Sequence, residues 1–311
     1  MFLTGFADEA GGDFAVQIKA TRELGWRFIE SRAIGSGTLG TISESEFDEV
    51  CRMLDESGIK INCYGSAVAN WSRDVRSPED HETNLRELRT AIPRMKKLGI
   101  GMLRGMSFRI VKDTPRPDLP ELEKEIFAKV QQYVDICAEN GIIYGHENCM
   151  NYGGLSWRHT LKLLDNIKGD NFRLIFDTGN PVLNYACDGD EPFALQSPWE
   201  FYANVREFIA YVHIKDAVAL PRENWREGVR EQAYTWPGEG CGDVRAIVID
   251  LLKNGYDGGF SMEPHVATVF HEKESAECRA SIKYQSYVEY GRRFMKLLED
   301  CSETVKEEHH D

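Results

Sequence analysis

Four side chains of the kinds that bind divalent metal ions follow four successive apolar segments of the sequence. They are Glu147 in YGHEN, Asp177 in IFDTGN, His213 in YVHIKD and Glu263 in FSMEPH. Taken singly, such an acid could simply cap the next helix, and such a histidine could be packed in the core. As a set, three carboxylates and one imidazole form a hard, oxygen-rich ligand set suited to Mn²⁺, Mg²⁺, Co²⁺ or Zn²⁺. We therefore expect one metal centre, with Mn²⁺ as the first choice.

These segments belong to a longer alternation of short β-type segments with segments of helical spacing. Strands are predicted to begin at Phe2, Arg27, Ile59, Gly101, Ile142, Phe172, Ile209 and Gly258. Helices are predicted at about 13–24, 44–57, 80–98, 119–139, 156–167, 198–207, 242–254 and 275–299. Ser43, followed three residues later by Glu46, forms a capping box at one predicted helix start. Such an alternation is typical of βαβ units in a parallel sheet.

The number of these units predicts the fold. Eight βα units, with no GxGxxG after the first strand, favour an α/β fold of the single (β/α)8 TIM barrel type over a doubly wound sheet. Residues 1–300 should form the catalytic barrel, and residues 301–311 a charged C-terminal tail. The C-terminal ends of the strands meet at one mouth of such a barrel, which would bring the four candidate ligands together. The loop at 218–240, after the seventh strand, should form a wall or lid there.

Composition limits the partners of the protein. The 311 residues include 51 acidic and 37 basic side chains, a net charge of −14 that repels phosphodiester backbones and anionic lipids. We therefore expect neither a nucleic-acid nor a membrane partner. The eight cysteines form no CxxC pair or compact cluster, which indicates free thiols in a reducing compartment. Asp8 and Glu9 come too early for a signal peptide, so a cytoplasmic protein is expected.

The chain resembles the xylose isomerase-like sugar isomerase/epimerase superfamily. The resemblance lies in the four metal-capable residues and in the motifs HEN, FDTGN, HIKD and PGEGCGDV. It implies a TIM barrel in which Glu147, Asp177, His213 and Glu263 hold one divalent metal, and a substrate that is a free or lightly modified sugar or keto-polyol. It also implies that Glu147 and Glu263 act as an acid/base pair that moves a proton through an enediolate. Barrels of this superfamily often form dimers or tetramers, so a homo-oligomer is expected.

Five further residues are candidates for substrate binding: Lys215, His265, Arg104, Asn180 and His146. Lys215 and His265 lie two residues after a candidate ligand, and Arg104 lies at the end of the fourth strand. His146 should point away from the mouth by strict strand alternation, unless the strand has already ended.

Two positions keep other activities open. Asn180 and Ala219 stand where the ketose 3-epimerases of the superfamily commonly have a histidine and an arginine. The alternative is a lyase or dehydratase of the same superfamily that acts on a keto-inositol or a 3-keto-glycoside. It would remove the same proton, and the enolate would then expel a β-substituent. A remote alternative is an apurinic endonuclease-like nuclease, which the acidic charge and the eight histidines disfavour.

Overall fold

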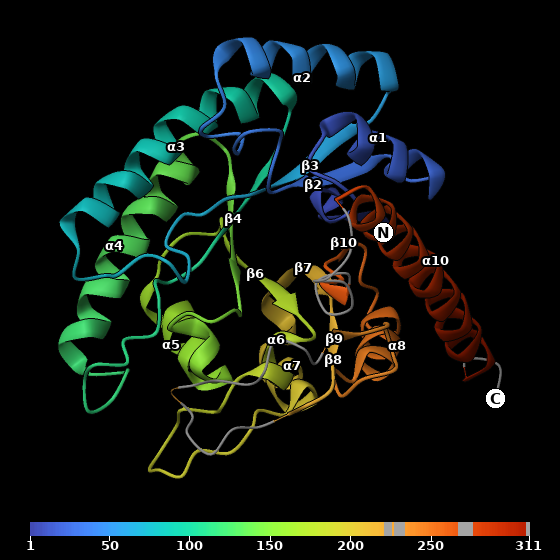
Figure 1. Cartoon of the computed structure of the whole chain (residues 1–311). Helices are drawn as coiled ribbons and strands as arrows, with labels where there is room; N and C mark the ends of the chain where they lie inside the picture. Colours follow the sequence, from blue (N-terminus) through green and yellow to red (C-terminus); the bar gives the residue numbers. More distant parts are fainter. Residues whose placement is uncertain (221–225, 227–233, 267–275, 309–311) are drawn as a thin grey trace.

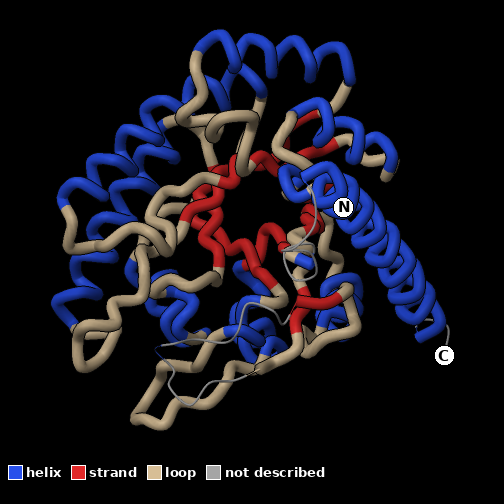
Figure 2. The backbone as a smooth tube through the Cα atoms, viewed as in Figure 1, coloured by secondary structure: helices blue, strands red, loops and turns tan. Residues whose placement is uncertain are grey.

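A ring of parallel strands surrounded by helices forms the centre of the molecule. The computed structural model describes residues 1–220, 226, 234–266 and 276–308. The strands of the ring are β1 (Phe2–Gly5), β2 (Phe28–Ser31), β3 (Lys60–Gly65), β4 (Met102–Gly105), β5 (Ile143–Glu147), β6 (Phe172–Asp177), β7 (Ile209–Ile214) and β10 (Gly259–Met262). They pair in the order β1-β10-β7-β6-β5-β4-β3-β2, and a bridge between Phe6 and Glu30 joins the two ends (Figure 2). The predicted TIM barrel is confirmed.

Helices cover the outside of this ring (Figure 1). They are α1 (Phe14–Glu23), α2 (Glu44–Ser57), α3 (Pro78–Leu98), α4 (Pro120–Glu139), α5 (Trp157–Asn166), the short α6 (Asn180–Leu183), α7 (Pro198–Val205), α8 (Val244–Lys253) and α10 (Ala276–Glu308). The capping box of Ser43 and Glu46 is present at the start of α2. Helix α10 is longer than expected, because it packs on α8 and buries Cys301. Residues 301–308 are therefore helical and do not leave the barrel as a separate tail.

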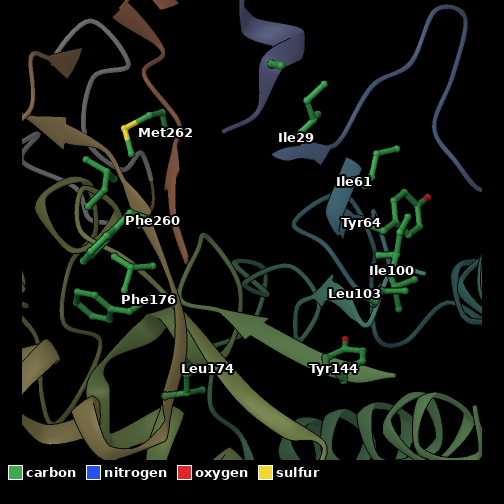
Figure 3. Packing of buried hydrophobic residues seen from close by; sticks show 14 of the residues in the cluster. Ile29, Ile61, Tyr64, Ile100, Leu103, Tyr144, Leu174, Phe176, Phe260 and Met262 are labelled. Atoms are coloured by element: carbon green, nitrogen blue, oxygen red, sulfur yellow. The ribbon is translucent and has the colours of Figure 1, made fainter. Parts of the chain in front are cut away.

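Strand alternation decides which side chains face the helices and which face the barrel interior. On β6, Leu174 and Phe176 point outward into the large core between strands and helices (Figure 3). Ile175 belongs to a separate small cluster inside the barrel. Because successive strand residues point to opposite faces, Asp177 at the end of β6 points inward like Ile175. The Asp177 carboxylate therefore faces the mouth of the barrel.

A buried aspartate holds the chain after β7. The antiparallel pair β8 (Asp216–Ala217) and β9 (Tyr234–Thr235) extends from this strand. Both carboxylate oxygens of Asp216 accept backbone N–H groups at 2.9–3.0 Å, from Ala217, Gly238, Gly240 and Gly242. A Cβ atom at Gly240 would lie 2.3 Å from the Asp216 carboxylate, so only glycine permits this approach. The PGEGCG motif thus serves to wrap a loop around one buried carboxylate.

Replacing Asp216 by Asn is expected to destabilise the protein by about 3 kcal/mol. The substitution removes the charge and turns an NH₂ group toward backbone N–H donors, so two hydrogen bonds to a carboxylate are lost. The thermal unfolding midpoint measures this loss, and Asp170→Asn, at an exposed aspartate, is the control. Equal midpoints for the two variants would contradict the role given to Asp216.

Two sequence-based expectations concern the surface of the molecule. Most of the expected lid at 218–240 falls on residues 221–225 and 227–233, outside the described residues. Tyr234, at its far end, is described and lines the cavity treated below. Among the described residues, no helix combines the length and the apolar character that crossing a bilayer requires.

Candidate metal centre

The structure brings the four candidate ligands together at the mouth of the barrel. Glu147 and Asp177 end β5 and β6, His213 lies one residue before the end of β7, and Glu263 follows β10. One ligand-type atom from each residue lies within 4.8 Å of the others, and all four residues are buried. Residues far apart in the sequence thus form one compact set, which we call the ligand group (Glu147, Asp177, His213 and Glu263).

Glu30 orients the imidazole of His213. Nε2 of His213 lies 3.2 and 3.1 Å from the two carboxylate oxygens of Glu30, which is itself buried. Ser261 donates a further hydrogen bond to Glu30 at 2.6 Å. Nδ1 of His213 therefore faces the other side, 3.4 Å from Glu147 Oε1 and 3.7 Å from Glu263 Oε2. A carboxylate behind a histidine in this way is the usual partner of a metal-binding imidazole.

Polar neighbours hold the carboxylates of Glu147 and Asp177. Asn180 donates to Glu147 Oε1 at 3.2 Å, and an Arg104 nitrogen lies 3.2 Å from Glu147 Oε2. One oxygen of Asp177 accepts the backbone N–H groups of Gly179 and Asn180 at 2.9 and 2.6 Å. Only the second oxygen of Asp177 is left to face the ligand group.

Lys215 places a positive charge beside two members of the ligand group. Its Nζ lies 2.9 Å from Glu263 Oε2 and 3.0 Å from Asp177 Oδ2. Its aliphatic stem lies over Gly179, where an added Cβ would come within 2.7 Å of the lysine Cγ. The Thr178 hydroxyl donates to the Lys215 carbonyl at 2.6 Å. The glycine of FDTGN therefore makes room for the lysine of HIKD.

Glu263 is surrounded by further charged groups from the first strands. Arg32, just after β2, donates to Glu263 Oε1 at 3.0 Å and also pairs with Asp8 and Glu9 after β1. His265 lies 3.3 Å from Glu263 Oε1 and 3.0 Å from Glu9. Asp8, Glu9 and Arg32 were not among the site residues predicted from the sequence. Their charged side chains directly after a predicted strand were the signal that could have identified them.

These neighbours set the pKa values of the ligand group. Burial would raise the pKa of Glu147, but Arg104 and the hydrogen bond with His213 hold it at about 2. Burial would lower the pKa of His213, yet Glu30 and Glu147 raise it to about 10. Burial raises the pKa of Asp177 to about 7, although Lys215 opposes the change. Glu147 therefore stays a carboxylate, as a metal ligand must, while His213 would have to lose a proton on binding an ion.

The ligand group fits a divalent ion. Within the described part of the chain, Glu147 Oε2, Asp177 Oδ2 and His213 Nδ1 are buried and accept or donate no well-formed hydrogen bond. Their nearest charged neighbours are Arg104 at 3.2 Å, Lys215 at 3.0 Å and the Glu147 carboxylate at 3.4 Å, respectively. Buried polar atoms normally make a hydrogen bond, and a cluster of such atoms that makes none is a place where an ion can bind. Three carboxylates and one imidazole suit a hard or borderline divalent cation. The ligand group therefore has both the donor atoms and the spacing that one divalent cation requires.

A cavity of about 530 Å³ opens beside the ligand group. Glu147 and Glu263 line it, together with four of the five residues expected to bind substrate: Lys215, His265, Arg104 and Asn180. This volume lies within the range of about 300–1,000 Å³ that is typical of small-molecule sites. The cavity is therefore large enough for a carbohydrate in contact with these side chains.

His146 does not reach this cavity, which corrects its selection as a substrate-binding residue. It precedes Glu147 on β5, so strand alternation turns it outward. It is buried 2.9 Å from the Ser107 hydroxyl and edge-on to the Phe172 ring. Burial lowers its pKa to about 4, so it is neutral at physiological pH. Its role is in the packing between the barrel and the outer helices.

Comparisons with known proteins agree with this architecture. A family model described as a xylose isomerase-like TIM barrel matches residues 18–285. An inosose dehydratase from Clostridium beijerinckii is 32% identical over 140 residues, which cover 42% of this chain and 43% of that protein. The match thus spans less than half of the relative's length.

Two solved structures share the fold. A D-tagatose 3-epimerase-like protein superposes with a TM-score of 0.72 at 17% identity, covering 98% of this chain and 100% of that chain. The IOLI protein with a bound zinc atom superposes with a TM-score of 0.72 at 15% identity, covering 96% and 99%. At these low sequence identities, the similarity shows that the folds are alike and nothing more.

Proposed function

We propose that this chain, which belongs to the xylose isomerase-like TIM barrel family, is a divalent-metal-dependent sugar isomerase or epimerase. Its substrate is a free or lightly modified sugar or keto-polyol that loses a proton beside its carbonyl group. The observation that carries the proposal is the buried ligand group, with its ligand atoms within 4.8 Å of one another beside a polar cavity. Mn²⁺ is our first choice of ion, and the zinc atom of one structural neighbour supports a divalent metal in general.

The ion would be held by the ligand group and would act as a Lewis acid on the substrate carbonyl. The chain's own residues move the proton. Glu147 and Glu263 both line the cavity and enter it from β5 and β10, which β6 and β7 separate in the ring. One carboxylate can therefore take the proton from one face of the carbon while the other returns it from the opposite face. Inversion of the carbon requires such a two-sided arrangement.

Other cavity residues support this transfer. Lys215 places its ammonium group beside the ligand group, where it can stabilise negative charge on a substrate oxygen. Arg104 and Asn180 hold Glu147, while Arg32 and His265 hold Glu263. Side chains locked in this way stay oriented for the reaction without reorganisation.

A second candidate is a dehydratase that acts on a keto-inositol or a 3-keto-glycoside. The sequence match with an inosose dehydratase supports it. The first step would again be removal of the proton beside the ketone, after which the enolate expels a β-hydroxyl or another β-substituent. Asn180, which hydrogen-bonds Glu147, and Ala219 are the two residues that differ from the ketose 3-epimerase pattern.

Proton exchange in D₂O separates these candidates. Metal-loaded protein is incubated with a panel of ketoses, keto-inositols and 3-keto-glycosides, and the products are followed by NMR. An isomerase or epimerase is expected to introduce deuterium at one carbon with altered structure or configuration. Loss of a substituent would identify the dehydratase. No exchange and no elimination with any panel member would contradict both.

A further inference from the structure

Three loops on one side of the cavity mouth are joined through their backbones. The Met106 amide donates to the Val68 carbonyl at 3.1 Å. The Phe108 amide donates to the Ala69 carbonyl at 2.5 Å, and the Phe108 carbonyl accepts the Tyr152 amide at 3.2 Å. We call this structure the three-loop rim; it consists of residues 66–74, 105–109 and 148–152. The rim is a continuous, hydrogen-bonded edge after β3, β4 and β5.

Two residues of the rim have unfavourable backbone conformations. Ala69 has φ +53° and Phe108 has φ +67°, in the left-handed region that residues with a side chain rarely adopt. Each such residue costs about 1–3 kcal/mol, and the cost persists only where the surrounding structure holds it. Both are buried and hydrogen-bonded to each other. The surrounding structure therefore holds these two residues in a strained backbone conformation. Such strained residues cluster at active sites and ligand-binding sites.

The rim presents two large apolar side chains at the cavity. Trp71 is 53% exposed and Met150 is 49% exposed, and both line the cavity. Among the described residues, no ring stacking and no cation–π contact involves Trp71, and it is one of the exposed large hydrophobic side chains. An apolar side chain stabilises a fold in proportion to the area it buries, so the exposed half of Trp71 is free to contact a ligand. Apolar surface held at the edge of a polar cavity is suited to an apolar part of a ligand.

The other side of the mouth is strongly polar. Asp8, Glu9, Arg32 and His265 line it after β1, β2 and β10. These groups and the ligand group are suited to hydroxyl and carbonyl oxygens. The cavity thus has a strongly charged side and a side that carries two large apolar side chains.

We propose that the substrate is a keto-glycoside with an aromatic aglycone. The oxidised sugar ring lies against the ligand group, and the aglycone ring stacks on Trp71 with Met150 beside it. Aromatic rings favour offset stacking and contacts with thioether sulfur, which these two side chains provide. This inference rests on the proposed function, because it places the reacting sugar at the ligand group. It narrows the lightly modified sugar of that proposal to a glycoside, and the second candidate would bind the same compound in the same way.

Binding of unreactive glycosides tests the inference apart from catalysis. Phenyl β-D-glucopyranoside and methyl β-D-glucopyranoside share the sugar and differ in the aglycone, and isothermal calorimetry measures their affinities. The phenyl glycoside is expected to bind about tenfold more tightly, which corresponds to about 1.4 kcal/mol. Trp71→Ala should abolish the difference, and Trp71→Phe should retain most of it. Trp199→Ala, at a tryptophan that is 40% exposed on α7 and does not line the cavity, should leave it unchanged.

Three results would overturn the inference. They are equal or undetectable binding of the two glycosides, an aryl preference that survives Trp71→Ala, and tighter binding of cellobiose than of the phenyl glycoside. The last would mean that the rim recognises a second sugar ring. Failure of the proposed function looks different: the aryl preference would persist, while the metal-loaded protein would exchange no substrate proton in D₂O.

Discussion

Replacing Glu147 or Glu263 by Gln is expected to lower turnover by about 10²- to 10⁴-fold, the usual effect of a lost general acid or base. Glutamine keeps an oxygen that can bind a metal but cannot take up a proton, so metal content should fall only modestly. Both residues line the cavity, and each is held by an arginine, Arg104 or Arg32. Steady-state kinetics and elemental analysis of each purified variant measure the two effects separately.

Isotope exchange makes this test sharper. In an epimerase with two bases, one of the Gln variants should still exchange the substrate proton with D₂O while failing to invert the carbon. A dehydratase with one base would show no such split. Glu121→Gln, at an exposed glutamate on α4, is the matched control and should behave as the unmodified protein. Near-normal turnover of both variants with full metal content would contradict the assignment and would make Lys215 and His265 the next residues to test.

Replacing His213 by Ala is expected to abolish stoichiometric metal binding. The substitution removes the one imidazole of the ligand group and leaves its three carboxylates close together without a neutral donor. Removing only the orienting carboxylate, by Glu30→Gln, should weaken the metal by about 10- to 100-fold, as is usual for partners of metal-binding histidines. Metal retained after dialysis and the rise of the unfolding midpoint on adding Mn²⁺ measure both effects, since an ion that binds only the folded state stabilises it.

His146→Ala provides the control for the histidine variant. His146 is also a buried histidine, on β5, but it does not line the cavity. Its loss should lower the unfolding midpoint through a packing defect and leave the stabilisation by Mn²⁺ unchanged. Should His213→Ala still bind one equivalent of Mn²⁺ with unaltered affinity, the metal centre described here is wrong.

Much of the fold was predictable because it depends on local patterns. Apolar and β-branched segments mark the strands, and the helical spacing between them marks the covering layer. The end of helix α10 was not predicted, because residues 301–308 read as a charged tail in isolation. In the structure Cys301 is part of the hydrophobic core, and helix α10, which packs on α8, continues to Glu308. Local composition could not show that contact with α8.

The sequence by itself determined the ligand group. Glu147, Asp177, His213 and Glu263 occupy corresponding positions at the ends of strands that form a parallel barrel. The two-residue period of a strand and the common direction of parallel strands then leave little freedom in where these side chains point. The candidate metal site could therefore be predicted before any distance was known. The side of the strand taken by His146, in contrast, depended on where β5 ended.

Only the tertiary structure decided what surrounds that group. Arg32 meets Glu263 across 231 residues of sequence, and Glu30 meets His213 across 183 residues. Both contacts arise because the ring closes: β1 pairs with β10 and is bridged to β2, so side chains at the end of β2 reach those of β10 and β7 across the mouth. The backbone bonds that hold Trp71 at the mouth likewise join loops from three different strands. Such contacts depend on the closure of the ring and on loop conformation, which no short stretch of sequence encodes.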